Sequence, residues 1–140
     1  MDEKQLLASA LKYLGYRPRS QKEILDFLRK KTSDENQINQ VVDQLVKLKL
    51  VNDTEFSDWL VKSRSRNRGS IFIKQDLKKR GIDTKNIAVN DLEIAQNLLK
   101  KKKFDDYQKA YSYLAYRGIP SSIIAQVLKK RYNGSNVNSD

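Results

Sequence analysis

Residues 50–83 read LVNDTEFSDWLVKSRSRNRGSIFIKQDLKKRGID. Apolar residues recur in this stretch at intervals of three and four, which is the spacing of one face of a helix. Gly69 and Gly81 interrupt the pattern, and a glycine after a periodic run is typical of a helix end. Basic residues gather before each glycine. The stretch therefore predicts a helix, a basic turn, a second helix and a second basic turn.

The same helical spacing continues from this stretch towards both termini. The chain contains only five glycines and two prolines, and each of them falls where the periodicity breaks. No run alternates apolar and polar residues for long enough to predict a strand. We therefore expect an all-α protein with about nine short helices that read as helix-turn-helix-like units.

Capping residues mark where several of these helices begin. Ser20 and Glu23 have the spacing of a capping box, in which each side chain bonds the backbone amide of the other residue. Ser33 or Asp34 is expected to cap the next helix, and Asp53 the one after it.

An internal repeat accounts for the order of the helices. Three leucines, each followed ten residues later by an isoleucine, take equivalent positions: Leu28, Leu77 and Leu114. One repeat buries little apolar surface alone, so we expect neighbouring repeats to stack into an elongated array. The pattern predicts three three-helix repeats and a disordered polar tail, over residues 1–51, 52–89, 90–132 and 133–140.

Positive charge is segregated along the chain. The formal net charge is +11. Residues 1–58 contain 10 Lys or Arg and 10 Asp or Glu, whereas residues 59–131 contain 18 Lys or Arg and 6 Asp or Glu. This asymmetry favours a polyanionic or acidic partner over a general role in solubility.

The residue types that common catalytic chemistry requires are missing. The chain has no cysteine and no histidine, so it lacks the thiolate nucleophile, the commonest general base and the commonest metal ligand. It has no metal-binding motif and no glycine-rich phosphate loop. We therefore expect neither an enzyme nor a metal or cofactor. No apolar run reaches the roughly 18 residues of a membrane span, and the absence of cysteine suits a cytoplasmic protein.

Three segments carry a resemblance to a known family. Residues 50–83 combine an acidic Asp53, an aromatic residue, a basic helix, a glycine, and a second helix that ends in a basic turn before Gly81. ALKYLGYRPRSQKEILDFL (10–28) and KAYSYLAYRGIPSSIIAQVL (109–128) flank this part in a matching order. Together they resemble the RecX family over most of the chain.

This resemblance implies a function and a set of contacts. It implies that the chain binds the filament of the RecA recombinase on single-stranded DNA, in its helical groove. It also implies inhibition or modulation of recombinase, ATPase and strand-exchange activity, in DNA repair and the SOS response. We expect a monomer, with weak direct DNA binding that follows from its charge. The residues expected to contact RecA or DNA are Arg17, Arg19, Lys62, Arg64, Arg66, Arg68, Lys74, Lys78, Lys79, Arg80 and Arg117.

Four of these cations follow one another closely before Gly69. On a helix over residues 53–68, Lys62 and Arg66 would flank one side of the apolar stripe, and Arg64 and Arg68 the other. Each side chain either contacts a partner or lies at the rim of the core with its stem buried.

The aromatic residues are open to two interpretations, core packing and base stacking. Trp59, Tyr107 and Tyr111 stand at helical spacing, and we expect them in the core. For Tyr13, Tyr16, Tyr113 and Tyr116 both interpretations stay open.

Two other classes of function are compatible with the pattern. A non-specific DNA-binding or RNA-binding helical module is the first, because helix-turn-helix readers also join two helices by a short turn. Ile71, Phe72 and Ile73 disfavour it, since a recognition helix carries polar residues near its start. A small enzyme is the second, and the lack of histidine and cysteine disfavours it.

Overall fold

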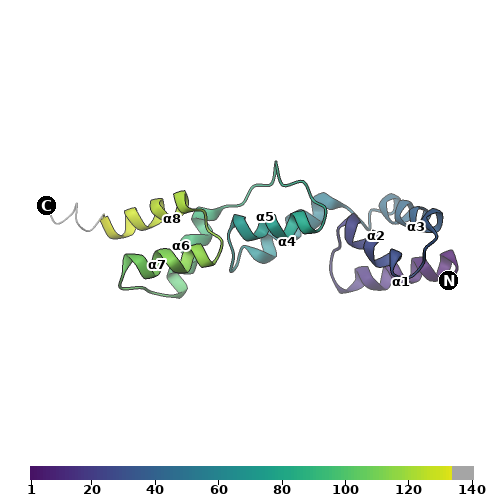
Figure 1. The fold of residues 1–140 in the computed structure, drawn as a ribbon, viewed down its shortest axis with the longest axis horizontal. Coiled ribbons are helices and arrows are strands. Elements are labelled where there is room, and N and C mark those ends of the chain that lie inside the picture. Colours follow the sequence, from purple (N-terminus) through teal and green to yellow (C-terminus); the bar gives the residue numbers. More distant parts are fainter. Residues whose placement is uncertain (134–140) are drawn as a thin grey trace. The chain divides into compact units, whose positions relative to one another are not determined.

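The structure is a computed structural model, and it describes residues 1–133. Every regular element in that range is helical, so the expectation of an all-α protein is confirmed (Figure 1). The residues of the expected tail from 134 onward lie outside the described residues. The elements are α1 (Glu3–Tyr16), α2 (Gln21–Arg29), α3 (Glu35–Lys47), α4 (Asp53–Arg64), α5 (Ser70–Lys79), α6 (Asp91–Lys101), α7 (Tyr107–Tyr116), α8 (Ser121–Leu128) and the π-helical turn η1 (Lys129–Asn133).

The chain packs as two compact units. Unit 1 comprises Met1–Leu60 and Leu77–Thr84, and unit 2 comprises Val61–Asp76 and Lys85–Asp140. The division passes through α4 and α5, so residues of each of these helices belong to both units. The division into units reflects how tightly residues pack. It does not test the repeat boundaries after residues 51 and 89, which stay a prediction.

The core of unit 1 lies between α1, α2 and α3. These three helices contribute apolar residues at helical spacing, and Figure 1 shows them packed together. Burial of such a stripe stabilises short helices that would be marginal in isolation. The buried residues of this core are Leu6, Ala10, Ile24, Leu28, Ile38, Val41, Val42, Leu45 and Val51.

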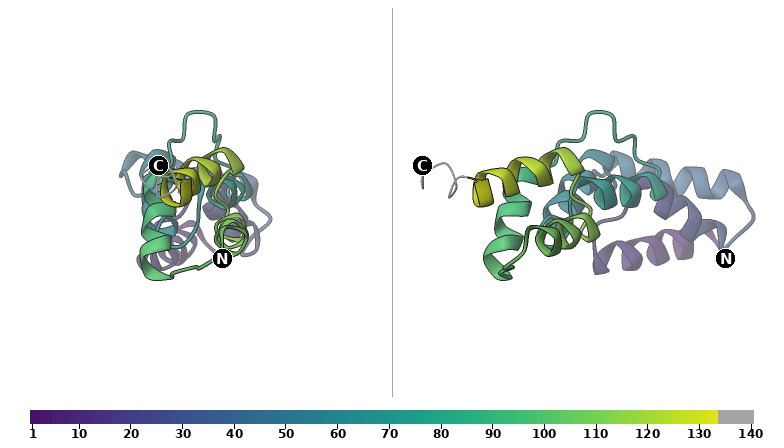
Figure 2. Two further views of the ribbon diagram at one scale, coloured as in Figure 1. Left: turned by 90° about the vertical axis from the view of Figure 1, so that its left-hand side faces the viewer. Right: turned by 60° about the vertical axis from the view of Figure 1, so that its left-hand side comes forward.

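The core of unit 2 lies between α6, α7 and α8, the green and yellow helices of Figure 2. The last turn of α7 stops at Gly118, whose φ of +86° lies in the left-handed region that glycine favours. The buried residues of this second core are Ile94, Ala95, Leu98, Leu99, Ala110, Leu114, Ile119, Ile124, Val127 and Leu128.

Two of the expected caps are confirmed, and one is wrong. Ser20 and Glu23 form a capping box at the start of α2. Asp34 caps α3. The cap of α4 is Asn52 rather than Asp53, because the Asn52 Oδ1 accepts two backbone N–H groups of the first turn at 2.9 and 3.1 Å. Asp53 is instead the first residue of the helix, and its carboxylate is used elsewhere.

The carboxylate of Asp53 takes part in a hydrogen bond that recurs in the chain. The backbone N–H of Gln21, the first residue of α2, donates to Asp53 Oδ1 at 2.9 Å. The backbone N–H of Ser70, the first residue of α5, donates to Asp91 Oδ1 at 2.7 Å. Each bond therefore joins the first amide of one helix to the carboxylate at the first position of a helix further along the chain.

One expected helix is shorter in the structure. Helix α4 ends at Arg64, and residues 65–67 form a turn, so Arg66 and Arg68 do not lie on a helical face. A further helical turn over these residues would fix several dihedral angles without burying an apolar face, so it does not persist. The connection from α5 to α6 carries a turn at residues 85–86 (Figure 1).

The expectation that Trp59 and Tyr107 lie in the core is wrong. Trp59 is half-buried, and its ring lies 5.7 Å from the guanidinium carbon of Arg17. Tyr107 is 38% exposed. The neighbouring Phe56, which is 1% exposed, takes the buried position in α4 instead.

Two glycine substitutions are expected to act in opposite directions. A Cβ at Gly118 would lie 2.5 Å from Cδ2 of Phe72, and the left-handed backbone costs an L-residue roughly 1–2 kcal/mol. Gly118→Ala should therefore lower the free energy of unfolding by about 2 kcal/mol or more. Gly15 lies in the last turn of α1 with nothing within 4 Å of an added Cβ, so Gly15→Ala should raise the free energy of unfolding by up to about 1 kcal/mol. Urea unfolding followed by circular dichroism measures both, and a Gly118→Ala protein as stable as wild type would contradict the packing described.

Candidate partner-binding surface

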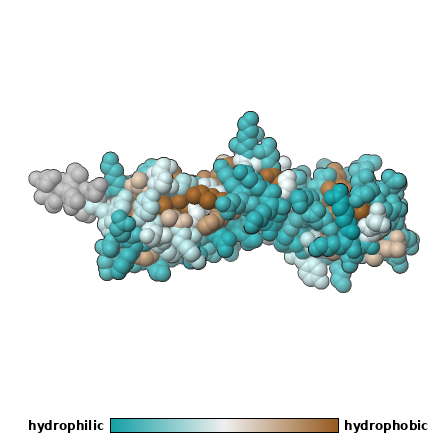
Figure 3. Space-filling view, viewed as in Figure 1, coloured by the Kyte–Doolittle hydropathy of each residue, from teal (hydrophilic) through white to brown (hydrophobic). Residues whose placement is uncertain are grey.

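The basic residues expected to contact a partner occur in both units. Unit 1 contains Arg17, Arg19, Lys78, Lys79 and Arg80. Unit 2 contains Lys62, Arg64, Arg66, Arg68, Lys74 and Arg117. Hydrophilic residues cover most of the face seen in Figure 3, so neighbouring contacts, rather than exposure alone, distinguish these side chains.

In unit 1, Arg17 and Arg80 meet at the carboxylate of Glu23. Arg17 donates two hydrogen bonds to it, and Arg80 Nε lies 3.7 Å from Glu23 Oε2. Glu23 also accepts the backbone N–H of Ser20 at 3.1 Å. The cluster therefore joins the end of α1, the start of α2 and the turn after α5, and it uses part of the charge of both arginines within the unit.

Arg19 is also engaged within unit 1. Its Nε donates to the carbonyl oxygen of Tyr13 at 3.3 Å, and its guanidinium carbon lies 3.7 Å from the centre of the Tyr13 ring. The Tyr13 ring stacks in turn on Phe27, with 4.1 Å between the ring centres. Arg19 therefore covers an aromatic pair beside the core of the unit.

The pKa of Glu23 is lowered from its ordinary value of 4.5. Burial alone would raise it, but hydrogen bonds from Arg17 and the Ser20 amide, with the charges of Arg17 and Arg80, outweigh that effect. A lowered pKa means that the ionised carboxylate is more stable in the folded state than in the unfolded state. The resulting stability is present above pH 4.5 and is lost as the pH falls through the lowered value.

Glu23→Gln should therefore destabilise unit 1 in a pH-dependent way. At neutral pH we expect a loss of about 1–3 kcal/mol in the free energy of unfolding, since hydrogen bonds to a charged group disappear. Below pH 4.5 the difference from wild type should shrink, because the wild-type carboxylate itself takes up a proton. Urea unfolding across this range measures the difference, and a constant offset at every pH would rule out the ionised carboxylate as its cause.

Five of the expected contact residues are exposed cations without an ion pair in residues 1–133. These are Lys62, Arg66 and Arg68 in unit 2, and Lys78 and Lys79 in unit 1. Lys74 is half-buried. Unlike Arg17, whose charge is partly compensated by Glu23, the five exposed side chains keep their full charge for a partner.

Unit 2 brings three of the expected arginines together around two neighbouring hollows. Arg64 pairs with Asp76 at 3.1 Å and lines the first hollow together with the exposed Arg68. Arg68 also lines the second hollow, of about 300 Å³, whose other lining residues are Phe72, Tyr116 and Arg117. No carboxylate lines this second hollow.

Backbone hydrogen bonds hold the second hollow in shape. The N–H of Gly69 donates to the carbonyl oxygen of Arg117 at 2.8 Å, and the N–H of Ile71 donates to that of Gly118 at 3.1 Å. A Cβ at Gly69 would lie 2.6 Å from the Gly118 oxygen, so the approach requires glycine there. The turn that carries Arg68 is thereby fixed to the turn that carries Arg117.

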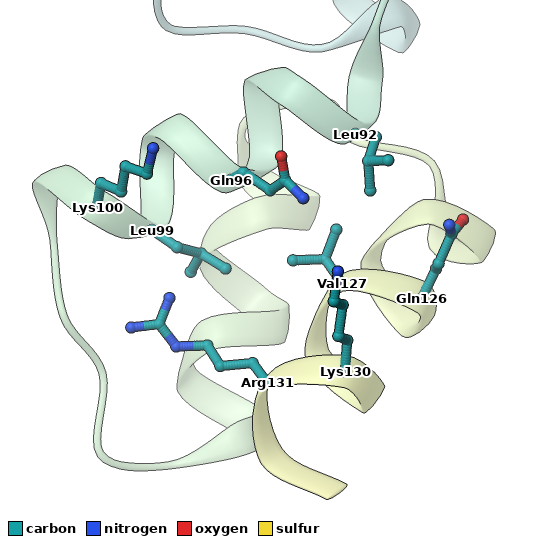
Figure 4. A pocket seen from close by; sticks show the side chains of 8 residues that line it. All are labelled: Leu92, Gln96, Leu99, Lys100, Gln126, Val127, Lys130 and Arg131. Carbon is teal, nitrogen blue, oxygen red and sulfur yellow. The ribbon is translucent and has the colours of Figure 1, made fainter. Parts of the chain in front are cut away.

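Sequence reasoning missed two aromatic residues of this hollow and a groove elsewhere in unit 2. Phe72 was expected only as an apolar residue, and the role of Tyr116 was left open. The groove lies between α6 and α8, has a volume of about 450 Å³, and combines an apolar floor with a basic rim (Figure 4). Its lining residues are Leu92, Gln96, Leu99, Lys100, Gln126, Val127, Lys130 and Arg131. The basic runs that begin at Lys100 and Lys129 were the sequence signal that could have indicated this groove.

Two classes of site can be assessed over the described part of the chain. No group of three or more acidic residues there is placed to hold a metal ion. No helix there is long and apolar enough to cross a membrane.

Comparison with known proteins places these observations in a family. A family model described as "RecX, first three-helix domain" matches residues 7–45, which include α2 and most of α1 and α3. Regulatory protein RecX of Chlorobium phaeobacteroides is 31% identical over 141 residues, which cover 91% of this chain and 93% of that protein. The chain belongs to the RecX family.

Other RecX proteins share the sequence pattern and the fold. Regulatory protein RecX of Oceanobacillus iheyensis is 31% identical over 136 residues, covering 84% of this chain and 50% of that protein. The crystal structure of RecX from Lactobacillus salivarius matches with a TM-score of 0.73 at 26% identity, covering 92% of this chain and 96% of that one. The chain spans only 50–66% of the length of three RecX relatives. The relatives matched by sequence are each named Regulatory protein RecX.

Proposed function

We propose that this chain binds the RecA filament on single-stranded DNA, in its helical groove, and inhibits the ATPase and strand-exchange activities of RecA. The observation that supports this most strongly is the relationship to a RecX regulatory protein over 91% of the chain. The chain acts as a monomeric cytoplasmic regulator and catalyses no reaction of its own.

The charge distribution supports the same proposal. A partner with an acidic surface attracts exposed cations over distances of about 10 Å, and this attraction mainly raises the association rate. Lys62, Arg66 and Arg68 lie close together in sequence at the end of α4, all are exposed, and none has an ion pair within the described residues. We assign the main contact in unit 2 to these three residues, and that in unit 1 to Lys78 and Lys79.

Four of the remaining expected residues take a supporting part in this proposal. Arg17 and Arg80 hold Glu23, Arg64 holds Asp76, and Arg19 covers Tyr13. Their substitution would disturb the fold as well as any contact, so a loss of activity in such variants is not evidence for contact.

Light scattering with preformed RecA filaments on single-stranded DNA tests binding directly. We expect the signal to rise until a fixed ratio of this protein to RecA is reached, and the affinity to fall steeply with salt. DNA without RecA is the control. If no association with the filament occurs at low salt, the proposal is refuted.

A non-specific DNA-binding module is the second candidate, favoured by the net charge of +11. The structure disfavours the helix-turn-helix form of it, because the start of α5 is joined to the end of α7 by the Gly69 and Ile71 amides. A recognition helix inserts its N-terminal end into the major groove. The start of α5 would therefore have to be accessible to DNA, and not bonded to the end of α7. Equally tight binding to DNA of unrelated sequences, with no effect on RecA, would favour this candidate over the first.

A further inference from the structure

Tyr116 presents an aromatic ring at the mouth of a positively charged hollow. It is 77% exposed, and it lines the same hollow of unit 2 as Arg68, Phe72 and Arg117. A tyrosine ring normally covers apolar surface, so a ring this exposed gains little from folding. The face of the ring is therefore free to stack on a ligand.

The two arginines of the hollow are held close to aromatic rings. The guanidinium carbon of Arg68 lies 5.9 Å from the centre of the Phe72 ring, and that of Arg117 lies 5.4 Å from the centre of the Tyr113 ring. The Nε of Arg117 is buried without a hydrogen-bond partner. Neither arginine has an ion pair in residues 1–133, so both cations are available to an anionic ligand.

Unit 1 contains the same dipeptide in a different electrostatic setting. Tyr16 is 73% exposed and is followed by Arg17, just as Tyr116 is followed by Arg117. Glu23 compensates the charge of Arg17, whereas no carboxylate lines the hollow beside Arg117. An exposed tyrosine and an available arginine therefore occur together only at the second position.

We propose that this hollow of unit 2 binds single-stranded nucleic acid, with one base stacked on Tyr116 and the adjacent phosphates paired with Arg68 and Arg117. Aromatic side chains beside arginines are the usual platform for single strands, since every base has a face that can stack. Guanidinium groups pair with phosphate oxygens through two parallel hydrogen bonds. A duplex hides the faces of its bases, and an acidic peptide would use the arginines without covering the ring.

This contact shares Arg68 with the proposed filament contact, but it requires no recombinase. Its test therefore contains no recombinase, so its failure would leave the proposed function untouched. The probe is a fluorescein-labelled oligo(dT) of about 20 nucleotides, which exceeds the site size of most single-strand binding modules. Fluorescence anisotropy gives its affinity for the full chain at several salt concentrations.

Two variants separate stacking from charge. Tyr116→Ala should weaken oligo(dT) binding about 5-fold or more without changing the dependence on salt, because stacking is lost and no charge is removed. Tyr116→Phe should bind within about twofold of wild type, because the ring remains. Arg68→Gln should weaken binding and reduce the salt slope by about one, as expected when one phosphate contact disappears.

Tyr16→Ala is the matched control, since it removes an equally exposed ring from unit 1. It should leave the affinity unchanged. The proposal is overturned if Tyr116→Ala binds like wild type, or if Tyr16→Ala loses as much affinity as Tyr116→Ala. A competition experiment gives a further outcome that overturns the proposal. If polyglutamate of matched charge displaces oligo(dT) equally well from wild type and from Tyr116→Ala, the hollow recognises negative charge alone.

Discussion

Replacing Lys62, Arg66 and Arg68 together by glutamate is expected to weaken inhibition of the RecA ATPase by about 100-fold, because like charges then face each other across the contact at a cost of several kcal/mol. All three side chains are exposed, and none has an acidic partner in the described residues. Surface changes of this kind usually alter the free energy of unfolding by about 0.5 kcal/mol or less each. The variant should therefore fold normally and fail to inhibit.

The choice of these three residues follows from the environment of Arg64. Arg64 pairs with Asp76 at 3.1 Å, so a glutamate at position 64 would place two carboxylates side by side and disturb unit 2. Leaving Arg64 in place keeps the loss of function separate from a loss of stability.

The matched control replaces Lys4, Lys12 and Lys47 by glutamate. These side chains are also exposed, and they lie in the part of the chain where acidic and basic residues balance. The control changes the net charge by the same amount, and we expect it to retain most of the inhibition. Equal loss of inhibition in both variants would show that total charge, rather than a contact at the end of α4, determines binding.

Leu114→Ala is expected to lower the free energy of unfolding by about 2–5 kcal/mol, the range found when a buried leucine is truncated. Leu114 is fully buried in α7, in the core that α7 shares with α6 and α8. The loss combines the apolar surface that is no longer buried with the cavity that remains. A loss of this size is a large part of the stability of an ordinary domain.

Leu48→Ala is the control for this truncation. Leu48 is 62% exposed, so its replacement should change the free energy of unfolding by about 0.5 kcal/mol or less. Urea unfolding followed by circular dichroism measures both variants. If Leu114→Ala were as mild as Leu48→Ala, the core described between α6, α7 and α8 would be wrong.

The burial of the three leucines at equivalent repeat positions was predicted well, because the helical spacing of apolar residues is a local property of the sequence. Leu28, Leu77 and Leu114 are all fully buried. The isoleucine partners were predicted less well: Ile38 and Ile124 are buried, but Ile87 is half-buried outside any helix. The connection after α5 lacks a continuous apolar face, and spacing alone does not reveal that.

The limits of helix α4 show where local reasoning fails. Its apolar stripe suggested a helix through Arg68, but the last turn contains only polar residues that bury nothing. Aspartate is a residue type that favours helix N-caps, yet the carboxylate of Asp53 accepts a hydrogen bond from the backbone amide of Gln21, 32 residues away in sequence. Such a long-range partner cannot be deduced from a neighbouring pattern.

The candidate surface was predicted as a class of residue rather than as an arrangement. Charge segregation pointed to the cations from residue 59 onward, but it did not separate Arg64, which pairs with Asp76, from Arg66, which has no ion pair within residues 1–133. The hollow around Arg68 and Arg117 depends on hydrogen bonds between the turn after α4 and the turn after α7. Those turns are far apart in sequence, so only the folded chain brings their arginines together.

The most direct test of the proposed function is the ATPase activity of RecA on single-stranded DNA while this protein is titrated in. We expect ATP turnover to fall progressively as the protein is added, to be restored by high salt, and to be unaffected by the Lys62, Arg66 and Arg68 glutamate variant at the same concentrations. ATP turnover that stays constant up to a molar excess of this protein over RecA, at low salt, would contradict the proposed function.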